Sequence, residues 1–484
     1  MSDLNIVAAV PVIIIALAAA VSLTVGLLPW RRIKLYGPGL IAAGSIIAAM
    51  VMSAVLWGDR QVAFDGNLYA DRFSLLLNFV FLTSALAVVA VSWREPSSVD
   101  RRGEYMGLLL MSLSGMMLVA GAGDLIVLFL GIELLSVGLY VLCALEVWRE
   151  RSLESGLKYL IVGAVGSAIF LYGLSLMFGA TGSVKLSEIG PTIGESGLAD
   201  EPLLLAAVAF IVVGLGFKAS AAPFHMWTPD VYEGAPTTIT MFMSTATKAA
   251  AIAAFLRIFQ GVLPDIQADW QAAIAAIAVA SIVVGNLAAL MQRNLKRLLA
   301  YSSIAQAGYL LIGVAAGTIE GAQATLYYLL AYLAMTLAAF AVVIAREREA
   351  ATGDDIDALA GYWRTRPMLA VVMTIAMLSL AGFPPLSGFI GKFLIFGSAV
   401  DADLTWLAVV GALGAVVSVV YYLRVVGVIW FSDPPADDRE PKVWISGGVG
   451  LTTVGAAVGV IALSLMASQI LDVCQGAAQS LLAP

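Results

Sequence analysis

The stretch LSLAGFPPLSGFIGKFLIFGSAV, residues 378–400, lies in a long apolar tract but contains Pro384, Pro385 and Lys392. Proline lacks a backbone N–H and clashes with the preceding turn, so a helix in lipid breaks there and leaves carbonyl groups that need water or a polar partner. Water at the break also makes the ammonium group of Lys392 tolerable. The stretch predicts a broken membrane helix with a functional lysine. The alternative is a proline kink used for packing, with Lys392 in a structural pair.

The composition predicts an all-α polytopic membrane protein. Of the 484 residues, 61% are hydrophobic and 12% are charged, and a soluble chain of this length cannot bury so much apolar surface. Two cysteines in apolar segments and a single histidine exclude a cysteine-rich or histidine-cluster site for a metal, an iron–sulfur cluster or haem. We therefore expect no cofactor in this chain, and a lipid bilayer rather than a nucleic acid around it.

Apolar stretches of about 20 residues predict the membrane spans. Fourteen such stretches lie near residues 5–28, 38–57, 73–92, 105–121, 124–145, 157–180, 203–222, 237–260, 270–291, 299–317, 321–346, 368–400, 404–430 and 443–468. The first is a membrane helix rather than a cleavable signal, because it is long enough to span and its positive charges follow it. We interpret residues 121–124 as a tight turn between two spans.

The positive charges of the predicted loops lie mostly on one side of this layout. Every second loop lies on the same side of the membrane. The loops of one side contain all the loop lysines and arginines except Arg60, Arg72 and Lys185, which lie on the other side. By the positive-inside rule the basic side is cytoplasmic, and both termini then face outside. The lysines and arginines that lie within predicted spans rather than in loops are Lys218, Lys248, Arg257, Lys392 and Arg424. We expect Arg257 and Arg424, which lie near helix ends, to extend to the membrane interface.

Spans 4–8 and spans 9–13 predict an inverted repeat. A unit of five helices ends on the side opposite its start, so a second copy enters the membrane upside down. The fourth helix of the first unit contains GLGFKASAAPF around Lys218, and the fourth helix of the second unit is the stretch around Lys392. Interruptions by Gly and Pro at matching places indicate a transport site. The predicted segments are residues 1–104, with three helices; 105–269 and 270–431, the two repeats; and 432–484, a loop and the last helix.

Four charged residues inside the membrane are candidates for a proton relay. Glu133 lies near the middle of the fifth span and Lys248 near the middle of the eighth, while Lys218 and Lys392 lie beside the breaks. Charges at such depth cost about 2.5–3.5 kcal/mol and usually belong to ion or proton pathways. Burial disfavours a charged lysine and a nearby carboxylate favours it, so a glutamate that approaches or leaves can load or unload the lysine. We interpret Glu133 and Lys218 as a switching pair, with Lys248 and Lys392 as successive sites; the alternative is a static ion pair.

Other polar residues belong to the same hypothesis. Lys158, at the cytoplasmic start of the sixth span, is either a proton-entry residue or an ordinary interfacial charge. His225 follows the first break and is either a gating or relay residue or an inert loop histidine. Polar side chains of the tenth span line a hydrated path or join helices; they are Tyr301, Ser302, Ser303 and Gln306.

Three long motifs resemble those of the antiporter-like subunits of respiratory complex I, a bacterial NADH–quinone oxidoreductase. They are APFHMWTPDVYEGAPTTIT (residues 222–240), NLKRLLAYSSIAQAGYLLIG (294–313) and LSLAGFPPLSGFIGKF (378–393). Within this group, PDVYEGAP and a lysine at position 392 are similar to the N subunit, whereas the M subunit usually has a glutamate there. The chain departs from many relatives at Thr237 and Thr238, where another proline is common.

The resemblance implies fourteen core helices with an inverted repeat and a proton-translocating subunit of the complex. It implies that Glu133 and Lys218 form the pair of the first half-channel, that Lys248 connects the halves and that Lys392 is the exit-side lysine. The implied partners are other membrane subunits and a peripheral redox arm that holds FMN and iron–sulfur clusters and reduces quinone outside this chain. An Ala-rich composition and the charge pattern favour a bacterial plasma membrane.

Two other functions remain open at this point. An Mrp-type cation/proton antiporter subunit would use similar lysines without NADH. A purely structural membrane subunit would use its charges only to pair helices.

Overall fold

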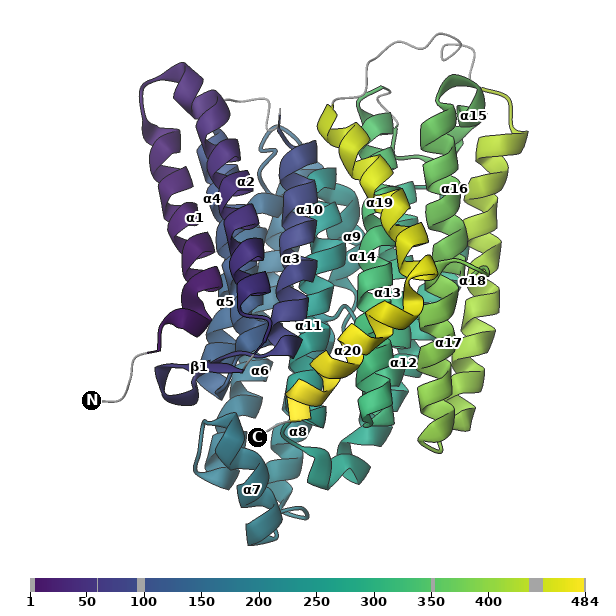
Figure 1. Cartoon of the computed structure of the whole chain (residues 1–484). Coiled ribbons are helices and arrows are strands. Elements are labelled where there is room, and N and C mark those ends of the chain that lie inside the picture. Colours follow the sequence, from purple (N-terminus) through teal and green to yellow (C-terminus); the bar gives the residue numbers. More distant parts are fainter. Residues whose placement is uncertain (1–4, 59, 94–100, 350–352, 435–446, 483–484) are drawn as a thin grey trace.

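The computed structural model describes residues 5–58, 60–93, 101–349, 353–434 and 447–482. These residues form a bundle of roughly parallel helices, and α1 begins and α20 ends at the lower end of the bundle (Figure 1). Twelve of the described helices are long and apolar enough to cross a membrane. Two shorter apolar helices, Pro202–Lys218 and Pro367–Ala381, are the first parts of two broken helices. The predicted all-α polytopic membrane protein is confirmed.

The N-terminal part contains the one short sheet found in the described residues. Helix α1 (Val10–Leu27) follows a single 3-10 turn and packs against α2 (Arg31–Val55). An antiparallel hairpin of β1 (Gln61–Ala63) and β2 (Leu68–Ala70) leads to α3 (Arg72–Val91). Helix α4 (Arg102–Gly121) turns sharply into α5 (Leu125–Cys143), as expected. The turn is stable because the Asp124 carboxylate accepts the Val127 N–H at 2.6 Å and caps α5.

The remaining helices complete the bundle. In chain order they are α6 (Glu150–Thr181), α7 (Leu186–Ser196), α8 (Pro202–Lys218), α9 (Trp227–Gly234), α10 (Thr237–Phe242), α11 (Lys248–Phe255), α12 (Gln267–Leu290), α13 (Leu295–Ala316), α14 (Ile319–Glu347), α15 (Tyr362–Thr365), α16 (Pro367–Ala381), α17 (Ser387–Asp401), α18 (Thr405–Phe431), α19 (Gly447–Leu465) and α20 (Ala467–Leu482). The π-helical turns Met243–Thr247 and Leu256–Gln260 make α10 and α11 one continuous span, Thr237–Gln260.

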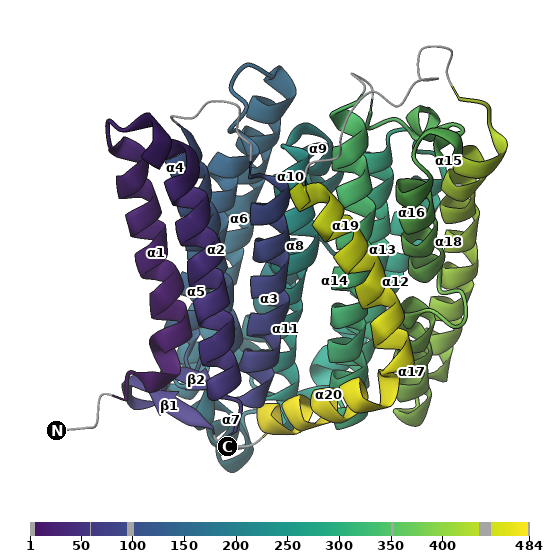
Figure 2. The ribbon, with the colours of Figure 1, turned by 45° about the horizontal axis from the view of Figure 1, so that its top comes forward.

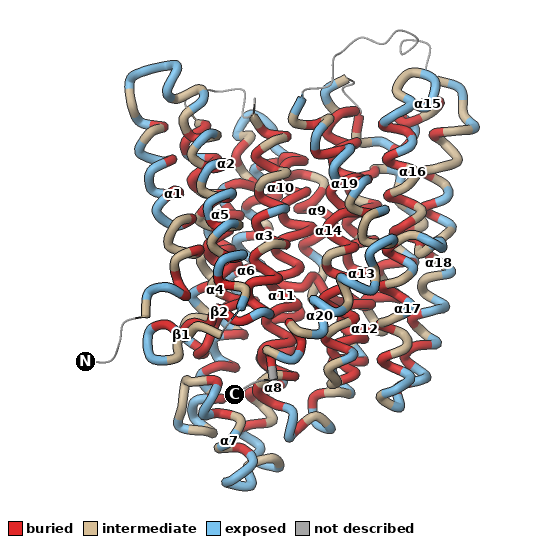
Figure 3. The backbone as a smooth tube through the Cα atoms, in the orientation of Figure 1, coloured by how far each residue is buried: buried red, intermediate tan, exposed pale blue. Residues whose placement is uncertain are grey.

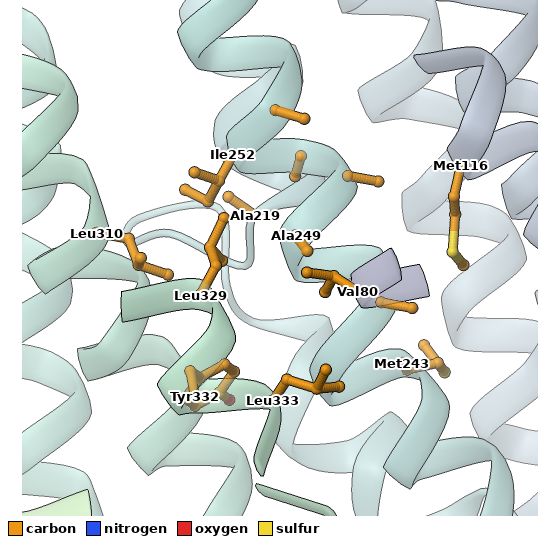
Figure 4. Close-up of a cluster of buried hydrophobic side chains, with 14 of the residues drawn as sticks. Val80, Met116, Ala219, Met243, Ala249, Ile252, Leu310, Leu329, Tyr332 and Leu333 are labelled. Carbon is orange, nitrogen blue, oxygen red and sulfur yellow. The ribbon is translucent and has the colours of Figure 1, made fainter. Parts of the chain in front are cut away.

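The core lies around this continuous span. Every residue from Thr237 to Gln260 is buried, and burial decreases toward the outer helices (Figure 3). Side chains from α3, α4, α11, α13 and α14 meet there, among them Val80, Met116, Ile252 and Leu329 (Figure 4). The outer helices α1, α2, α6 and α18 expose leucine and valine, which suits contact with lipid.

The helix limits differ from the predicted spans mainly at polar ends. Helix α2 begins at Arg31 and α6 at Glu150, about two turns earlier than expected, because the polar residues that precede an apolar run still form helical turns. The structure also contains two amphipathic helices that hydropathy did not predict, α7 and α20; Figure 2 shows α20 running across the bundle at its lower end. Two predicted loops lie outside the described part of the chain, together with the basic residues assigned to them: residues 94–100 and residues 435–446. The second range includes residues 443–446, the start of the last predicted span.

Each of the two predicted five-helix units contains an isolated β-bridge, and the two bridges lie at matching places in the units. Asp124, at the start of α5, pairs with Lys185, which precedes α7; Asn294, at the start of α13, pairs with Asp355, which precedes α15. Each first partner also caps its helix with its side chain. In Figure 1, α7 lies at the lower end of the bundle and α15 at the upper end. The same local arrangement therefore occurs at opposite ends of the bundle.

Candidate functional site

The two helices that carry Lys218 and Lys392 are broken beside their Gly and Pro residues, as predicted. Helix α8 ends at Lys218, and α9 begins at Trp227 after the non-helical residues 219–226. Helix α16 ends before Gly382, and α17 begins at Ser387. Gly382 has φ of +91°, in the left-handed region that favours glycine. A Cβ atom there would lie 3.2 Å from Cδ of Lys392, so this glycine lets the lysine pack against the break.

Lys218 contacts α5 through a serine. Its side chain is 8% exposed, and Nζ donates a hydrogen bond of 2.8 Å to Ser136 Oγ. Ser136 lies one turn after Glu133 on α5, and the Glu133 carboxylate is near enough to act electrostatically on the ammonium group. Within the described residues, Glu133 Oε1 is buried without a hydrogen-bond partner, and no direct ion pair joins it to Lys218. The predicted pair therefore occupies adjacent helices with Ser136 beside the lysine.

Lys248 connects the first break to α13. Its side chain is 2% exposed, and Nζ donates to the carbonyl oxygens of Ala219, at 3.2 Å, and Ser303, at 2.6 Å. Ala219 directly follows Lys218, and Ser303 belongs to α13. The π-helical turn that ends at Thr247 precedes Lys248. Such turns change the phase of a helix and are frequent at functional sites.

Lys392 lies against the second break. Its side chain is 3% exposed, and Nζ donates to the carbonyl oxygens of Leu380, at 2.8 Å, and Ala381, at 3.2 Å. These are carbonyl groups of the last turn of α16, which carry partial negative charge and lack helical partners. Nζ also lies 4.8 Å from the ring centre of Tyr309, a favourable distance for a cation–π contact.

A chain of polar side chains joins the surroundings of Lys248 to those of Lys392. Ser302, next to Ser303, forms a short hydrogen bond with the Tyr422 hydroxyl. Gln306 Nε2 donates to Tyr422 Oη at 3.2 Å and to the Leu380 carbonyl at 3.4 Å, the same carbonyl that Lys392 contacts. Ser302 and Gln306 of the tenth predicted span therefore join α13 to α18, and Gln306 also joins it to α16. Tyr301 instead packs under the Arg297 guanidinium.

Lys158 belongs to a charged pocket near the start of α6. Its side chain is 42% exposed, and Nζ lies 2.7 Å from Glu154 and 2.8 Å from Asp230 of α9. Arg297 joins the same group through Asp230 and Glu233, each at 2.9 Å. The pocket has a volume of about 200 Å³. Alternating charges and open access make this pocket suitable for proton exchange with water.

His225 lies half-buried in the first break. Its Nδ1 atom is buried and has no hydrogen-bond partner among the described residues. Its neighbour Met226 is 76% exposed, so the loop is close to the surface of the chain. The described contacts do not join His225 to Lys218 or Lys248.

Arg257 and Arg424, both expected to extend to the membrane interface, each contact a polar group at the end of a neighbouring helix. Arg257 is 4% exposed and pairs with Asp71 at 2.8 Å, because the carboxylate that caps α3 lies inside the bundle and offers it a partner. Arg424 donates to the Leu290 carbonyl at 2.9 Å, at the end of α12.

Sequence reasoning missed one buried lysine. Lys296 was assigned to a loop, but it is fully buried in the first turn of α13. Its Nζ donates to the Ala235 carbonyl at 2.9 Å and lies 3.9 Å from Glu347, which accepts a hydrogen bond from Thr237 at 2.8 Å. Lys296 lies seven residues before Ser303, on the same helical face, and this spacing was the available signal.

A helical membrane bundle with two broken helices and a buried lysine at each break has the features of a membrane transport protein. Comparison with known proteins assigns it more closely. A family model described as NADH:quinone oxidoreductase/Mrp antiporter, TM, matches residues 122–418. The NADH-quinone oxidoreductase subunit N of Chloroflexus aggregans is 40% identical over 474 residues, which cover 97% of this chain and 96% of that protein.

Solved structures agree with this assignment. A chain of respiratory complex I from Thermus thermophilus with bound aureothin is 35% identical and has a TM-score of 0.81, covering 96% of this chain and 98% of its own. A chain of the Mrp complex from Dietzia sp. has a TM-score of 0.82, with 100% of this chain and 98% of its own covered, but at 21% identity it shows the fold alone. This chain belongs to the NADH:quinone oxidoreductase/Mrp antiporter family of membrane subunits and groups with the N subunits of NADH-quinone oxidoreductase.

Proposed function

We propose that this chain translocates protons as a membrane-arm subunit of NADH:quinone oxidoreductase, without redox chemistry of its own. FMN, the iron–sulfur clusters and the quinone site lie in partner subunits. Identity to N subunits over nearly the whole chain supports the assembly. The observation that carries the transport role is the series of three buried lysines joined by polar contacts across the bundle.

The contacts suggest how a proton moves. The charge on Glu133 stabilises a protonated Lys218, and Ser136 holds its ammonium group. Lys248 receives the proton across residues 219–226, where non-helical backbone can hold water, since its Nζ already contacts Ala219. The Ser302, Tyr422 and Gln306 side chains then lead to Lys392. Moving one proton against 100 mV costs about 2.3 kcal/mol, so redox energy from partner subunits must drive the relay.

Lys158 and His225 extend this relay. Lys158 is the entry residue, because its open pocket exchanges protons with water while Asp230 connects it to α9 beyond the first break. His225 acts as a gating residue, because its imidazole lies in the non-helical segment between α8 and α9 and its buried Nδ1 has no hydrogen-bond partner among the described residues.

The relay fits an inverted repeat of residues 105–269 and 270–431, between residues 1–104 and 432–484. The matching bridges at Asp124 and Asn294 support this division. So do close helix contacts at equivalent places: a Cβ atom on Gly115 would lie 2.4 Å from α5 backbone, and one on Gly285 would lie 2.5 Å from α13 backbone. We place the chain in a bacterial plasma membrane with both termini outside, because the loop charges follow the positive-inside rule.

An Mrp-type antiporter subunit is the second candidate, supported by the shared fold. The experiment that separates the two uses whole complexes with Lys218→Ala, after their assembly has been checked. We expect NADH-dependent quinone reduction and the proton gradient to fall together, with no cation exchange in the absence of NADH. Cation exchange without an electron donor would favour the antiporter. Wild-type reduction and pumping in an assembled variant would refute the relay.

A further inference from the structure

An apolar pocket lies between α3, α14 and α19. Its volume is about 470 Å³, within the range of small-molecule sites, roughly 300–1,000 Å³. Leucine, alanine, glycine, threonine and no charged residue line it; Leu333 and Ala334 form the side from α14, and Gly455 and Gly459 the side from α19.

The pocket continues toward the end of α3 into a second pocket of about 360 Å³. Leu86 and Ala90 line both pockets, and Trp93 and Arg348 line only the second. Tryptophan and arginine are typical of the membrane–water interface. The Arg348 guanidinium donates to the Val91 carbonyl at 2.7 Å, which holds its positive charge at the end of the second pocket. The combined site is therefore apolar at one end and cationic at the other.

The surrounding helices decide what can occupy this site. Helices α3, α14 and α19 contact one another in all three pairs, which leaves no room between them for a further helix about 10 Å wide. A flexible aliphatic chain is narrow enough. A Cβ atom on Gly455 would meet no atom within 4 Å, so this glycine leaves the groove open.

The length of the site also suits a lipid. Residues from Gly447 to Leu463 of α19 line the two pockets. At a rise of 1.5 Å per residue they extend about 24 Å along the helix. Half of the hydrocarbon core measures roughly 15 Å, so a chain that starts at the interface near Arg348 reaches the middle of the bilayer within this site.

We propose that the two pockets bind one anionic phospholipid, with its phosphate at Arg348 and an acyl chain between α3, α14 and α19. The charge of Arg348 selects the anionic headgroup, and the small residues of α19 admit the chain. Such a lipid fills the space between the N-terminal helices and the second five-helix unit. The proposal does not depend on the proton relay.

Native mass spectrometry of the whole complex tests the proposal. Gly455→Leu fills the open part of the groove and replaces glycine by a better helix former, so the helix is expected to remain intact. Gly427→Leu in α18 is the matched control, because a Cβ atom there also meets no atom within 4 Å but lies outside both pockets. We expect Gly455→Leu to lose one tightly held phospholipid per copy of this chain and Gly427→Leu to keep it.

A second variant tests the headgroup. Complexes are reloaded from vesicles with equal amounts of phosphatidylglycerol and phosphatidylethanolamine. Wild type should retain phosphatidylglycerol selectively, and Arg348→Gln should reduce this preference about fivefold. Unchanged lipid retention in Gly455→Leu, a retained quinone in place of phospholipid, or an unchanged preference in Arg348→Gln would overturn the proposal.

Discussion

Replacing Asp71 by asparagine removes one negative charge while keeping the shape of the side chain and its ability to cap α3. In the native structure the Asp71 and Arg257 side chains are 0% and 5% exposed. Arg257 Nη1 lies 2.8 Å from Asp71 Oδ2, and Nη2 lies 3.3 Å from Oδ1. Arg257 Nε is already buried without a partner among the described residues, so the carboxylate is a main compensation for the arginine charge.

The size of the effect follows from this geometry. Removing one partner of a buried ion pair costs about 3–5 kcal/mol. Asparagine caps a helix about as well as aspartate and can still accept one hydrogen bond, so we expect the lower end, about 3 kcal/mol. That is roughly a hundredfold change in the equilibrium constant for unfolding. Adding Arg257→Met should restore most of the loss, because an apolar pair of similar volume is often as stable.

The assay is denaturant-dependent proteolysis of this chain within the solubilised complex. Asp124→Asn is the matched control: Asp124 caps α5 in the same way and is 4% exposed, but has no ionic partner in the described part of the chain. Equal stability of the two variants would refute the reasoning.

The dependence on pH offers a second readout. Burial alone raises the pKa of Asp71, but Arg257 and the Ser74 N–H lower it below its ordinary value overall. A carboxyl group with a lowered pKa contributes stability above its unfolded pKa and loses it as the pH falls. The stability difference between wild type and Asp71→Asn should therefore shrink in acid.

Three further predictions concern the surroundings of the buried lysines. Ser136→Ala removes the hydroxyl that accepts a charge-assisted hydrogen bond from Lys218, and such a bond is worth about 1.5–3 kcal/mol. We expect this variant to slow proton pumping about tenfold or more with little effect on assembly. Pumping at the wild-type rate would contradict this role of Ser136. Gly382→Ala places a methyl group 3.2 Å from Lys392 Cδ on a residue with positive φ, which should destabilise the chain by about 1–2 kcal/mol and lower coupled quinone reduction. Gly397→Ala is the control, because a methyl group there meets no atom within 4 Å, and it should leave quinone reduction unchanged. Lys296→Met should impair assembly less than Glu347→Leu, because the latter leaves a buried ammonium group without its carboxylate, and subunit content of isolated membranes measures both.

The sequence predicted the features that depend on local chemistry. Prolines and glycines determine where the backbone can leave a helix, so the breaks after Lys218 and before Ser387 were visible in the residues. Hydropathy likewise located the apolar spans. It missed α7 and α20, because a helix that is apolar on one face alone lacks the continuous run that a hydropathy scan detects.

The contacts of individual charges were harder to predict, because they depend on helices that are distant in sequence. Arg257 lies 186 residues from the carboxylate that neutralises it, and Lys296 lies 61 residues from the Ala235 carbonyl that it contacts. Position within a span indicates how deep a charge lies but not which neighbour faces it. The same limit applies to Lys218, whose direct contact is Ser136 rather than the predicted glutamate.

The three lysines of the proposed relay differ in what holds them, and within that proposal this difference indicates where the relay is controlled. Lys248 and Lys392 contact backbone carbonyl groups, whose positions are fixed by the helices that carry them. Neither forms an ion pair among the described residues, so a change in their protonation must come from charge on a neighbouring site. Lys218 instead lies near Glu133, a carboxylate with one oxygen that has no hydrogen-bond partner in the described part of the chain. In the proposed relay, a movement of α5 that changes the separation between Glu133 and Lys218 therefore alters the charge at the first site, and we expect the next lysines to respond through electrostatic repulsion. Glu133→Gln should then abolish pumping more completely than Ser136→Ala in assembled complexes, because it removes the controlling charge rather than one contact; the reverse order would place control elsewhere in the chain.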